Sequence, residues 1–444
     1  MLTAEARRTA LLTGPIIPTM LGLALPTLMV IAAQTFVAVL EVYWISRLGT
    51  DAVAGVSLVL PLFVLMGTMS NGGIGGGVSS AIARAVGGAA ANDANALLTH
   101  ALMIAVAFGA LFMGVMLAAG RPIYLALGGS SAALEQALSY SHWVFGLAAP
   151  IWLVNLIGSA LRGAGEVKLP ALISLVGAVF MIPVVPALIF GIGPIPPLGI
   201  AGAGLALGAY YGGALVVFLR YLVSGKGVLT LSLHPVARRH IYAIMGVGLI
   251  SALGKLTASI TTVAITGIVG GFGPAALAGF GIASRVDSLI VPLLFGLGTA
   301  VITMIGVATG AGDLDRARRV AWTAAAMAFA VAELFGLLLF AAPWQWNAAF
   351  SQDAAVLAVG NAYFTVVAPF YGLLGMGLIL FFACQGRGKM AWPFVAGIAR
   401  LAVTAIGAWL LARGGAPLPV VFGAVAGGVA VFGAVNAYGF WRSS

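Results

Sequence analysis

The chain has 444 residues, of which 62% are hydrophobic and 7% charged, and its formal net charge is +10. Soluble domains carry about 25% charged residues, so a soluble fold of this composition would have no polar surface. The excess of Lys and Arg could suit nucleic acid, but these residues are scattered among short loops and fit the positive-inside rule better. The composition therefore excludes a soluble protein and predicts an integral membrane protein whose partner is the lipid bilayer and not nucleic acid.

Twelve apolar segments are long enough to cross a bilayer as helices. They cover residues 16–46, 52–82, 95–119, 133–161, 167–191, 199–223, 240–269, 275–309, 317–342, 355–385, 391–413 and 417–441. With the N-terminus in the cytoplasm, 15 Lys and Arg lie inside, 3 lie outside and 3 lie within the spans. This bias predicts an all-α membrane protein with twelve transmembrane helices and both termini in the cytoplasm. The single cysteine, Cys384, excludes an internal disulfide framework.

The first helix holds a carboxyl group, Glu41, among aliphatic and aromatic neighbours. An ionised carboxylate at membrane depth costs about 2.5–3.5 kcal/mol on insertion scales, so such residues are mostly functional. Gln34 lies two turns below Glu41 on the same helix face, and Pro26 interrupts the helix fifteen residues before Glu41. Glu41 is therefore a candidate ion-coupling residue, Gln34 a candidate for the substrate cleft, and Pro26 a candidate for gating at a kink. The alternatives for Glu41 are a static ion pair, for instance with Lys255, and an acid that reaches the outer surface.

The second helix contains the glycine-rich stretch "SNGGIGGGVSS" at 70–80. A phosphate-binding loop is excluded, because the stretch lies inside an apolar span, follows no strand and precedes no Lys-Ser/Thr pair. Small residues on a membrane helix let a neighbouring helix approach closely, so we expect close packing here. Asn71, within this stretch, is a further candidate for the substrate cleft.

The fourth helix carries Asn155, and Tyr140 lies near its outer end. Both are candidates for the substrate cleft, although a hydrogen bond between helices is the commoner role of such residues. The four histidines have no metal-ligand spacing, so we expect neither a metal site nor a cofactor.

Lys255 lies within the seventh helix. It is a candidate for the substrate cleft or for an ion pair with Glu41, and the alternative is that its ammonium group extends to the cytoplasmic surface. Arg285 and Asp287 lie two positions apart at the start of the eighth helix, on different faces. For these two we expect salt bridges to neighbouring helices.

The two halves of the sequence resemble one another. "GTDAVAG" at 49–55 matches "FGPAALAG" at 272–279 with an offset of 224, and "ALRGAGEVKLP" at 160–170 matches "ACQGRGKMAWP" at 383–393 with an offset of 223. Six helices per half is an even number, so both halves enter the membrane the same way and a pseudo-two-fold axis along the membrane normal relates them. The predicted parts are a six-helix bundle at 1–223, a cytoplasmic connecting loop at 224–239 and a second six-helix bundle at 240–444.

These residues resemble the multidrug and toxic compound extrusion (MATE) family, and the resemblance covers essentially the whole chain. In the first half it rests on Pro26, Glu41, "LGTDAVAG" at 48–55, "RGAGEVKLP" at 162–170 and "LGIAGAGLALG" at 198–208. In the second half it rests on "FGPAALAG" at 272–279, "ASRVDSLIVPLLFGLGTA" at 283–300, "GAGDLDRARR" at 310–319 and "QGRGKMAWP" at 385–393. The "SRVDSL" stretch resembles the DinF-like branch.

The resemblance implies an inner-membrane antiporter that exports organic cations or amphipathic compounds by alternating access, with H+ favoured over Na+ as the coupling ion. The family places an acid fifteen positions after a proline on its first helix, which here gives Glu41, a glutamate where aspartate is usual. The chain departs from the family elsewhere. Met181 and Val185 stand where proton-coupled relatives carry Asn and Asp, and the seventh and tenth helices hold no Asp or Glu.

Other functions are less consistent with the sequence. A flippase or exporter of lipid-linked or polysaccharide precursors from the same superfamily remains the alternative, although it favours more Arg and Lys in the cleft than Lys255 alone. An intramembrane enzyme would need paired acids, a metal set or a Ser/His pair at one depth, and we expect no enzyme. A passive channel is disfavoured by the repeat and the single buried acid. We expect a monomer that handles a small molecule.

Overall fold

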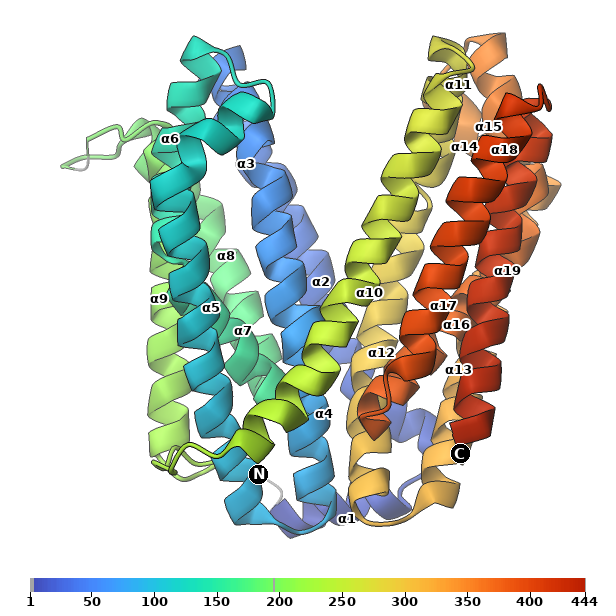
Figure 1. Cartoon of the computed structure of the whole chain (residues 1–444). Coiled ribbons are helices and arrows are strands. Elements are labelled where there is room, and N and C mark those ends of the chain that lie inside the picture. The colour runs from blue at the N-terminus through green and yellow to red at the C-terminus, as the bar shows by residue number, and fades with distance from the viewer. Residues whose placement is uncertain (1–3, 195, 444) are drawn as a thin grey trace. The chain divides into compact units, whose positions relative to one another are not determined.

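The computed structural model describes residues 4–194 and 196–443, and the regular structure of these residues is helical (Figure 1). Eleven helical segments are long and apolar enough to cross a bilayer, and one bent helix pair makes a twelfth span. The predicted all-α architecture of twelve spans is therefore confirmed. After the short helix α1 (Ala4–Thr13), the spans of the first half are α2 (Ile16–Ser46), α3 (Thr50–Thr68) with η1 (Met69–Gly73) and α4 (Ile74–Gly87), α5 (Ala91–Ala126), α6 (Ser131–Gly146) with α7 (Ala148–Gly163), α8 (Lys168–Phe190) and α9 (Ile200–Val223).

The second half follows the same order. Its spans are α10 (Arg238–Gly270), α11 (Pro274–Ser284) with α12 (Asp287–Gly310), α13 (Leu314–Ala341), α15 (Ala354–Val367) with η2 (Ala368–Phe370) and α16 (Tyr371–Arg387), α17 (Ala391–Leu401) with η3 (Ala402–Ile406) and α18 (Gly407–Arg413), and α19 (Leu418–Ser443). The short helix α14 (Pro343–Ala348) lies between α13 and α15.

The fourth span is bent, which the apolar pattern alone does not show. Helices α6 and α7 meet at an angle of 48°. Pro150 lies on the first turn of α7, where it has no N–H to donate to the Gly146 carbonyl and its ring would clash with that carbonyl in a continuous helix. The proline therefore explains why the helix breaks between Gly146 and Ala148.

The internal repeat is visible in where the helices begin. Thr50 and Pro274 start α3 and α11 at an offset of 224, and Ala148 and Tyr371 start α7 and α16 at an offset of 223. The residues before α3 and α11 are Gly49 and Gly273, with φ angles of 110° and 109°. Residues with a Cβ rarely adopt such values, so both halves need glycine at the same turn. The sequence match at 49–55 and 272–279 thus reflects one shared backbone conformation.

The chain folds into two compact units. One comprises the chain up to Arg8 together with Leu25–Gly248, and the other comprises Thr9–Ala24 together with Leu249–Ser444. The sequence-based boundary lies in the loop 224–239, whereas the divisions fall inside α1, α2 and α10. The divisions in α2 and α10 are 224 positions apart, which is the offset of the repeat. Helices α2 and α10 therefore each contribute to both units at equivalent positions.

Helix α7 is the centre of the first unit and packs against α4, α5 and α9 (Figure 1). Its Trp152 is fully buried, and Phe108 from α5 stacks on the indole at 5.0 Å between ring centroids. In the second unit the equivalent helix, α16, packs against α12, α13 and α19. Both central helices are rich in small residues, which allow several neighbours to approach one helix closely.

Glycines set the distance between α4 and α7. A Cβ placed on Gly75 would lie 2.6 Å from the Ser159 hydroxyl oxygen, and one on Gly163 would lie 2.8 Å from the Ser79 Cα. Such distances leave no room for a side chain, so the two helix backbones are in direct contact. The close packing predicted for residues 70–80 is confirmed.

Large apolar side chains are exposed along the spans. Val39, Val179 and Val263 are 63%, 67% and 73% exposed, although each lies inside a helix that can cross a bilayer. Apolar surface of this extent is unfavourable in water and is stable against lipid chains. The exposed apolar faces therefore identify an integral membrane protein.

Candidate functional site

A cavity of about 310 Å³ lies within the first unit, between α2, the α3–η1 segment, α7, α8 and α9. Its apolar walls are broken by side chains that can form hydrogen bonds. The polar lining residues are Gln34, Glu41, Asn71, Asn155, Ser174, Tyr210 and Tyr211. Among the described residues of the lining, Glu41 is the one carboxylate, and Lys and Arg are absent. The cavity is thus a mostly apolar chamber with a single acid.

Glu41 reaches this cavity because α2 turns one face toward it. Gln34, Val37 and Ala38 line the cavity together with Glu41, as the spacing of a helix predicts. The buried Tyr140 on α6 donates its hydroxyl to the Glu41 Oε1 at 2.8 Å. Among the described residues of its own unit, Glu41 has no Lys, Arg or His nitrogen within salt-bridge distance. The carboxyl group is therefore held by a neutral donor and not by a cation.

Two amide side chains of the cavity lining, Asn155 and Asn71, form hydrogen bonds with residues of neighbouring helical segments. Asn155 on α7 donates its Nδ2 to the Ser70 hydroxyl of η1 at 2.8 Å. Asn71 of η1 accepts at its Oδ1 a hydrogen bond of 2.8 Å from an Arg162 guanidinium nitrogen, and the same nitrogen also donates to Ser159. The close contact of α4 and α7 brings these pairs together.

Two adjacent tyrosines from α9 form another wall. The rings of Tyr210 and Tyr211 lie 4.7 Å apart and are tilted by 54°. The Tyr210 hydroxyl interacts with the Gln34 and Ser174 side chains. These aromatic rings give the cavity flat faces on which a planar ligand can pack.

The predicted site residues fall into three groups. Gln34, Glu41, Asn71 and Asn155 line one cavity, and Tyr140 contacts Glu41 without belonging to the lining. Lys255 belongs to the second unit, where its ammonium nitrogen lies 4.9 Å from the centre of the Phe295 ring. Pro26 lies inside α2 and leaves the Gly22 carbonyl without its helical N–H donor.

The second unit has an ionisable cluster of its own. Asp287 lies in the electrostatic field of Arg400, and Tyr363 and Tyr371 lie close to the same carboxyl group. At an offset of 223, Tyr363 is the repeat counterpart of Tyr140. Arg285 instead places its guanidinium 6.0 Å from the Phe350 ring centre. Among the described residues neither Asp287 nor Arg285 has a salt-bridge partner within 4.0 Å, so the expected salt bridges are not observed, and Arg400 is only a cationic neighbour of Asp287.

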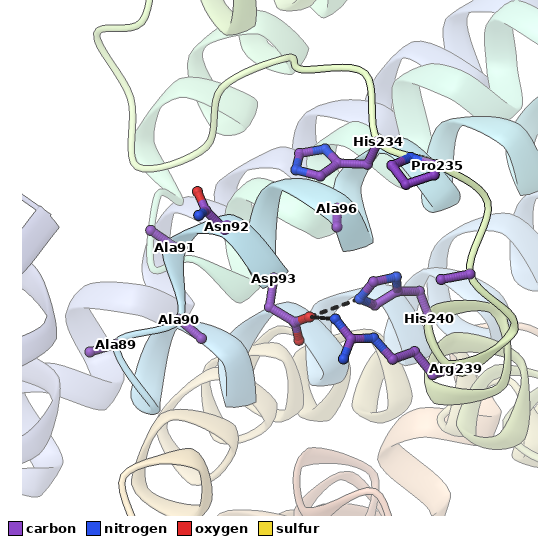
Figure 2. A pocket seen from close by; sticks show the side chains of 11 residues that line it. Ala89, Ala90, Ala91, Asn92, Asp93, Ala96, His234, Pro235, Arg239 and His240 are labelled. Carbon is purple, nitrogen blue, oxygen red and sulfur yellow. Dashed lines mark hydrogen bonds and ion pairs between the residues drawn. The ribbon is translucent and has the colours of Figure 1, made fainter.

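A second pocket, of about 660 Å³, lies where the connecting segment meets the start of α5 (Figure 2). Its carboxylate, Asp93, accepts hydrogen bonds from Arg239 at 2.9 Å and from His240 at 2.8 Å. The connecting segment is also fixed to α5 by two hydrogen bonds between Asn95 and Thr230. The acid of this pocket is already paired, so these contacts attach the connecting segment to the first unit.

Two repeats of six membrane spans, with a mostly apolar cavity that holds a few polar side chains at the level of the spans, follow the general plan of secondary transporters. The MatE family model matches residues 26–187 and 251–410, one stretch in each half of the chain. The chain belongs to this family of multidrug and toxic compound extrusion transporters.

Proteins of known identity agree with this assignment. The FAD transporter of Shewanella oneidensis is 27% identical over 415 residues, which cover 89% of this chain and 87% of that protein. The probable multidrug resistance protein YoeA of Bacillus subtilis is 24% identical over 358 residues, covering 79% and 77%. The crystal structure of MATE in the bent conformation shares the fold with a TM-score of 0.90 at 22% identity, over 98% of this chain and 97% of that chain. The DinF-like branch stays a prediction.

Proposed function

We propose that this transporter exports organic cations or amphipathic compounds in exchange for protons, and that substrate and proton compete for Glu41. The observation that carries the proposal is the position of Glu41, the one carboxylate among the described residues that line the cavity. An ionised carboxylate attracts a cationic substrate, whereas a protonated one does not. Because the ionised form of Glu41 binds the cation more tightly than the protonated form, proton uptake at Glu41 drives release of the cation. The exchange is completed by alternating access of the site to the two sides of the membrane.

Proton coupling is favoured over sodium coupling by the ligands present. Sodium requires several oxygen ligands, usually including more than one carboxyl or carbonyl group, whereas a proton requires one titratable group. The cavity also holds the amide oxygens of Gln34 and Asn155, but it supplies one carboxylate, and the Tyr140 hydroxyl that donates to it directs its hydrogen toward the carboxylate. This arrangement suits a proton or an organic cation better than a bare metal ion.

The FAD transporter relative raises a second substrate class, a flavin dinucleotide. The Tyr210–Tyr211 pair could pack on a flat ring system, but the cavity lining contains no Lys or Arg among its described residues to neutralise a diphosphate. A lipid-linked precursor also carries a diphosphate, so the absence of Lys and Arg from the described lining disfavours it as well. We therefore keep the cationic or neutral amphipathic class as the proposal and these anionic classes as alternatives.

We further propose that the protein is a monomer in the bacterial inner membrane with both termini in the cytoplasm. The cytoplasmic position of the termini is supported by the distribution of 15 Lys and Arg inside and 3 outside. In this arrangement the bundles 1–223 and 240–444 are joined on the cytoplasmic side by the loop 224–239. Lys255 remains a candidate for the substrate cleft, and its ammonium nitrogen lies 4.9 Å from the centre of the Phe295 ring.

The proposal is tested by reconstituting the protein in liposomes and following a fluorescent lipophilic cation under an imposed proton gradient, with and without sodium. We expect transport that depends on the proton gradient and is unchanged by sodium. Transport that requires sodium would contradict proton coupling. Uptake of FAD, but not of the cation, would establish the flavin alternative instead.

Removing the hydroxyl group that binds Glu41 should weaken transport. Tyr140→Phe leaves the ring in place but deletes a hydrogen bond to a charged group, which is worth about 1.5–3 kcal/mol. We expect substrate affinity or coupled transport to fall about tenfold or more. Tyr242→Phe is the matched control, because Tyr242 is 73% exposed and lies outside the cavity. Equal activity of the two variants would show that Tyr140 has no part in the site.

We propose that α2 bends at Pro26 in response to the protonation of Glu41 on the same helix. Pro26→Ala restores an N–H donor for the Gly22 carbonyl and stiffens the helix next to the division between the two units at Ala24 and Leu25. We expect slower transport with unchanged insertion into the membrane. Pro61→Ala, which alters another proline within a helix, is the control. Transport and pH dependence identical to wild type in Pro26→Ala would rule out this gating role.

A further inference from the structure

We infer that Asn71 is a specificity-determining residue that recognises a hydrogen-bond acceptor on the substrate, and that Arg162 orients it for this role. The inference rests on the proposed substrate cavity and adds to it a chemical requirement. A preferred substrate carries a cationic group for Glu41 and, at some distance from it, a carbonyl oxygen for Asn71.

The orientation of the Asn71 amide follows from the chemistry of its partner. A guanidinium group has donors and no acceptor, so only the amide oxygen of Asn71 can face Arg162. The observed bond joins the Arg162 guanidinium to the Asn71 Oδ1 at 2.8 Å. The Nδ2 group, with its two N–H donors, is then the end of the side chain that Asn71 presents to the cavity it lines. Arg162 thus fixes Asn71 as a donor.

The backbone around Asn71 supports the same role. Asn71 lies in η1, a five-residue π-helical turn that interrupts the span between α3 and α4. Such turns insert an extra residue into a helix and occur frequently at functional sites. Ser70 in this turn binds Asn155 of α7, so the turn is held from two sides, by Ser70–Asn155 and by Asn71–Arg162. The side chain of Asn71 is therefore fixed before a ligand arrives.

The two recognition groups lie at different levels of the cavity. Helices α2 and α3 are joined by the short turn between Ser46 and Thr50, so they run in opposite directions across the membrane. Glu41 lies near this turn, five positions before the end of α2, whereas Asn71 lies beyond the far end of α3. A ligand that contacts both must place its cation and its acceptor apart. Because Arg162 lies behind Asn71 and is not part of the lining, the acceptor interacts with the amide and not directly with the guanidinium.

The test uses matched pairs of trimethylalkylammonium cations that differ in one group. In each pair one member has a ketone near the end of the chain and the other has a methylene group at that position, and the pairs span several chain lengths. Binding is measured by titration calorimetry with the full-length protein in lipid nanodiscs. For each compound the affinity of wild type is divided by that of Asn71→Leu, which cancels differences in membrane partitioning.

We expect this ratio to be about fivefold larger for the ketone than for its methylene partner at one chain length, which is the effect of one hydrogen bond. Arg162→Gln should remove most of the preference for the ketone. Glutamine can accept as well as donate a hydrogen bond, so the Asn71 amide can rotate by 180° and present its oxygen to the cavity. Arg162→Lys, which retains a pure donor, should preserve the preference. Asn92→Leu, at an exposed asparagine outside the cavity, is the control and should behave as wild type.

Equal ratios for ketone and methylene compounds at every chain length would overturn the inference and leave the exporter proposal standing. A preference that survives in Arg162→Gln would overturn the orienting role of Arg162. If no cation of either kind binds to wild type, the cavity is not the substrate site, and both the inference and the proposed function fail. Thermal unfolding of each variant verifies that it is folded.

Discussion

Glu41→Gln is expected to abolish proton-driven export. Glutamine keeps the shape of glutamate and can still bind Tyr140, but it neither carries a negative charge nor exchanges a proton. The cavity would then lack its one described carboxylate and, with it, the competition between cation and proton. In liposomes with an imposed proton gradient, we expect the transport of a lipophilic cation to fall at least tenfold, to the level of protein-free vesicles.

The matched control for this variant is Glu135→Gln. Glu135 lies on α6 in the same unit, but it is 65% exposed and pairs with Arg121 at 3.2 Å, so the loss of its charge should have little effect on transport. Both variants should insert into the membrane to the same extent as wild type. If Glu41→Gln transports like wild type, the acid is structural, and Lys255 and Asp287 become the next candidates for ion coupling.

Gly163→Val is expected to destabilise the first unit strongly. A Cβ at Gly163 would lie 2.8 Å from the Ser79 Cα, so the side chain would push the backbones of α4 and α7 apart. Overpacking against a rigid backbone costs about 3 kcal/mol, which corresponds to a fall of about 5–10 °C in the melting temperature. The same displacement would separate Asn71 from Arg162, because Arg162 lies on α7 and Asn71 lies in η1, which leads directly into α4.

The effect is measured by thermal unfolding of the purified protein in detergent. Gly114→Val is the matched control, because a Cβ at Gly114 has open space around it and the residue is exposed on α5. We expect this control to unfold within about 2 °C of wild type. A melting temperature of Gly163→Val equal to that of the control would show that the α4–α7 contact can adapt.

Features that depend on composition and spacing could be predicted from the sequence. The first span, predicted at 16–46, is α2 (Ile16–Ser46), because an uninterrupted apolar run defines a membrane helix. The helical period also places Gln34 and Glu41 on one face, and both line the same cavity. The paired glycines Gly49 and Gly273 were part of the repeat match, and the structure explains them by their backbone conformation.

Features that depend on contacts between helices could not be predicted. Tyr210 and Tyr211 were not among the predicted site residues, since an aromatic pair in an apolar span is equally common on lipid-facing surfaces. The Tyr140–Glu41 bond joins residues 99 positions apart and depends on how α6 packs. The sequence places Arg162 only in the motif at 162–170, whereas in the structure its guanidinium donates to the Asn71 amide oxygen. Spacing along one helix gives no information about such pairs.

The most direct measurement of the central claim is the number of protons released when a cationic substrate binds. Purified wild-type protein is mixed with a lipophilic cation in weakly buffered solution near neutral pH, and a pH indicator records the change. If cation and proton compete for Glu41, binding releases up to one proton per cation in wild type and none in Glu41→Gln. Binding to wild type without proton release at any pH, or equal release by both proteins, would contradict the proposed exchange at Glu41.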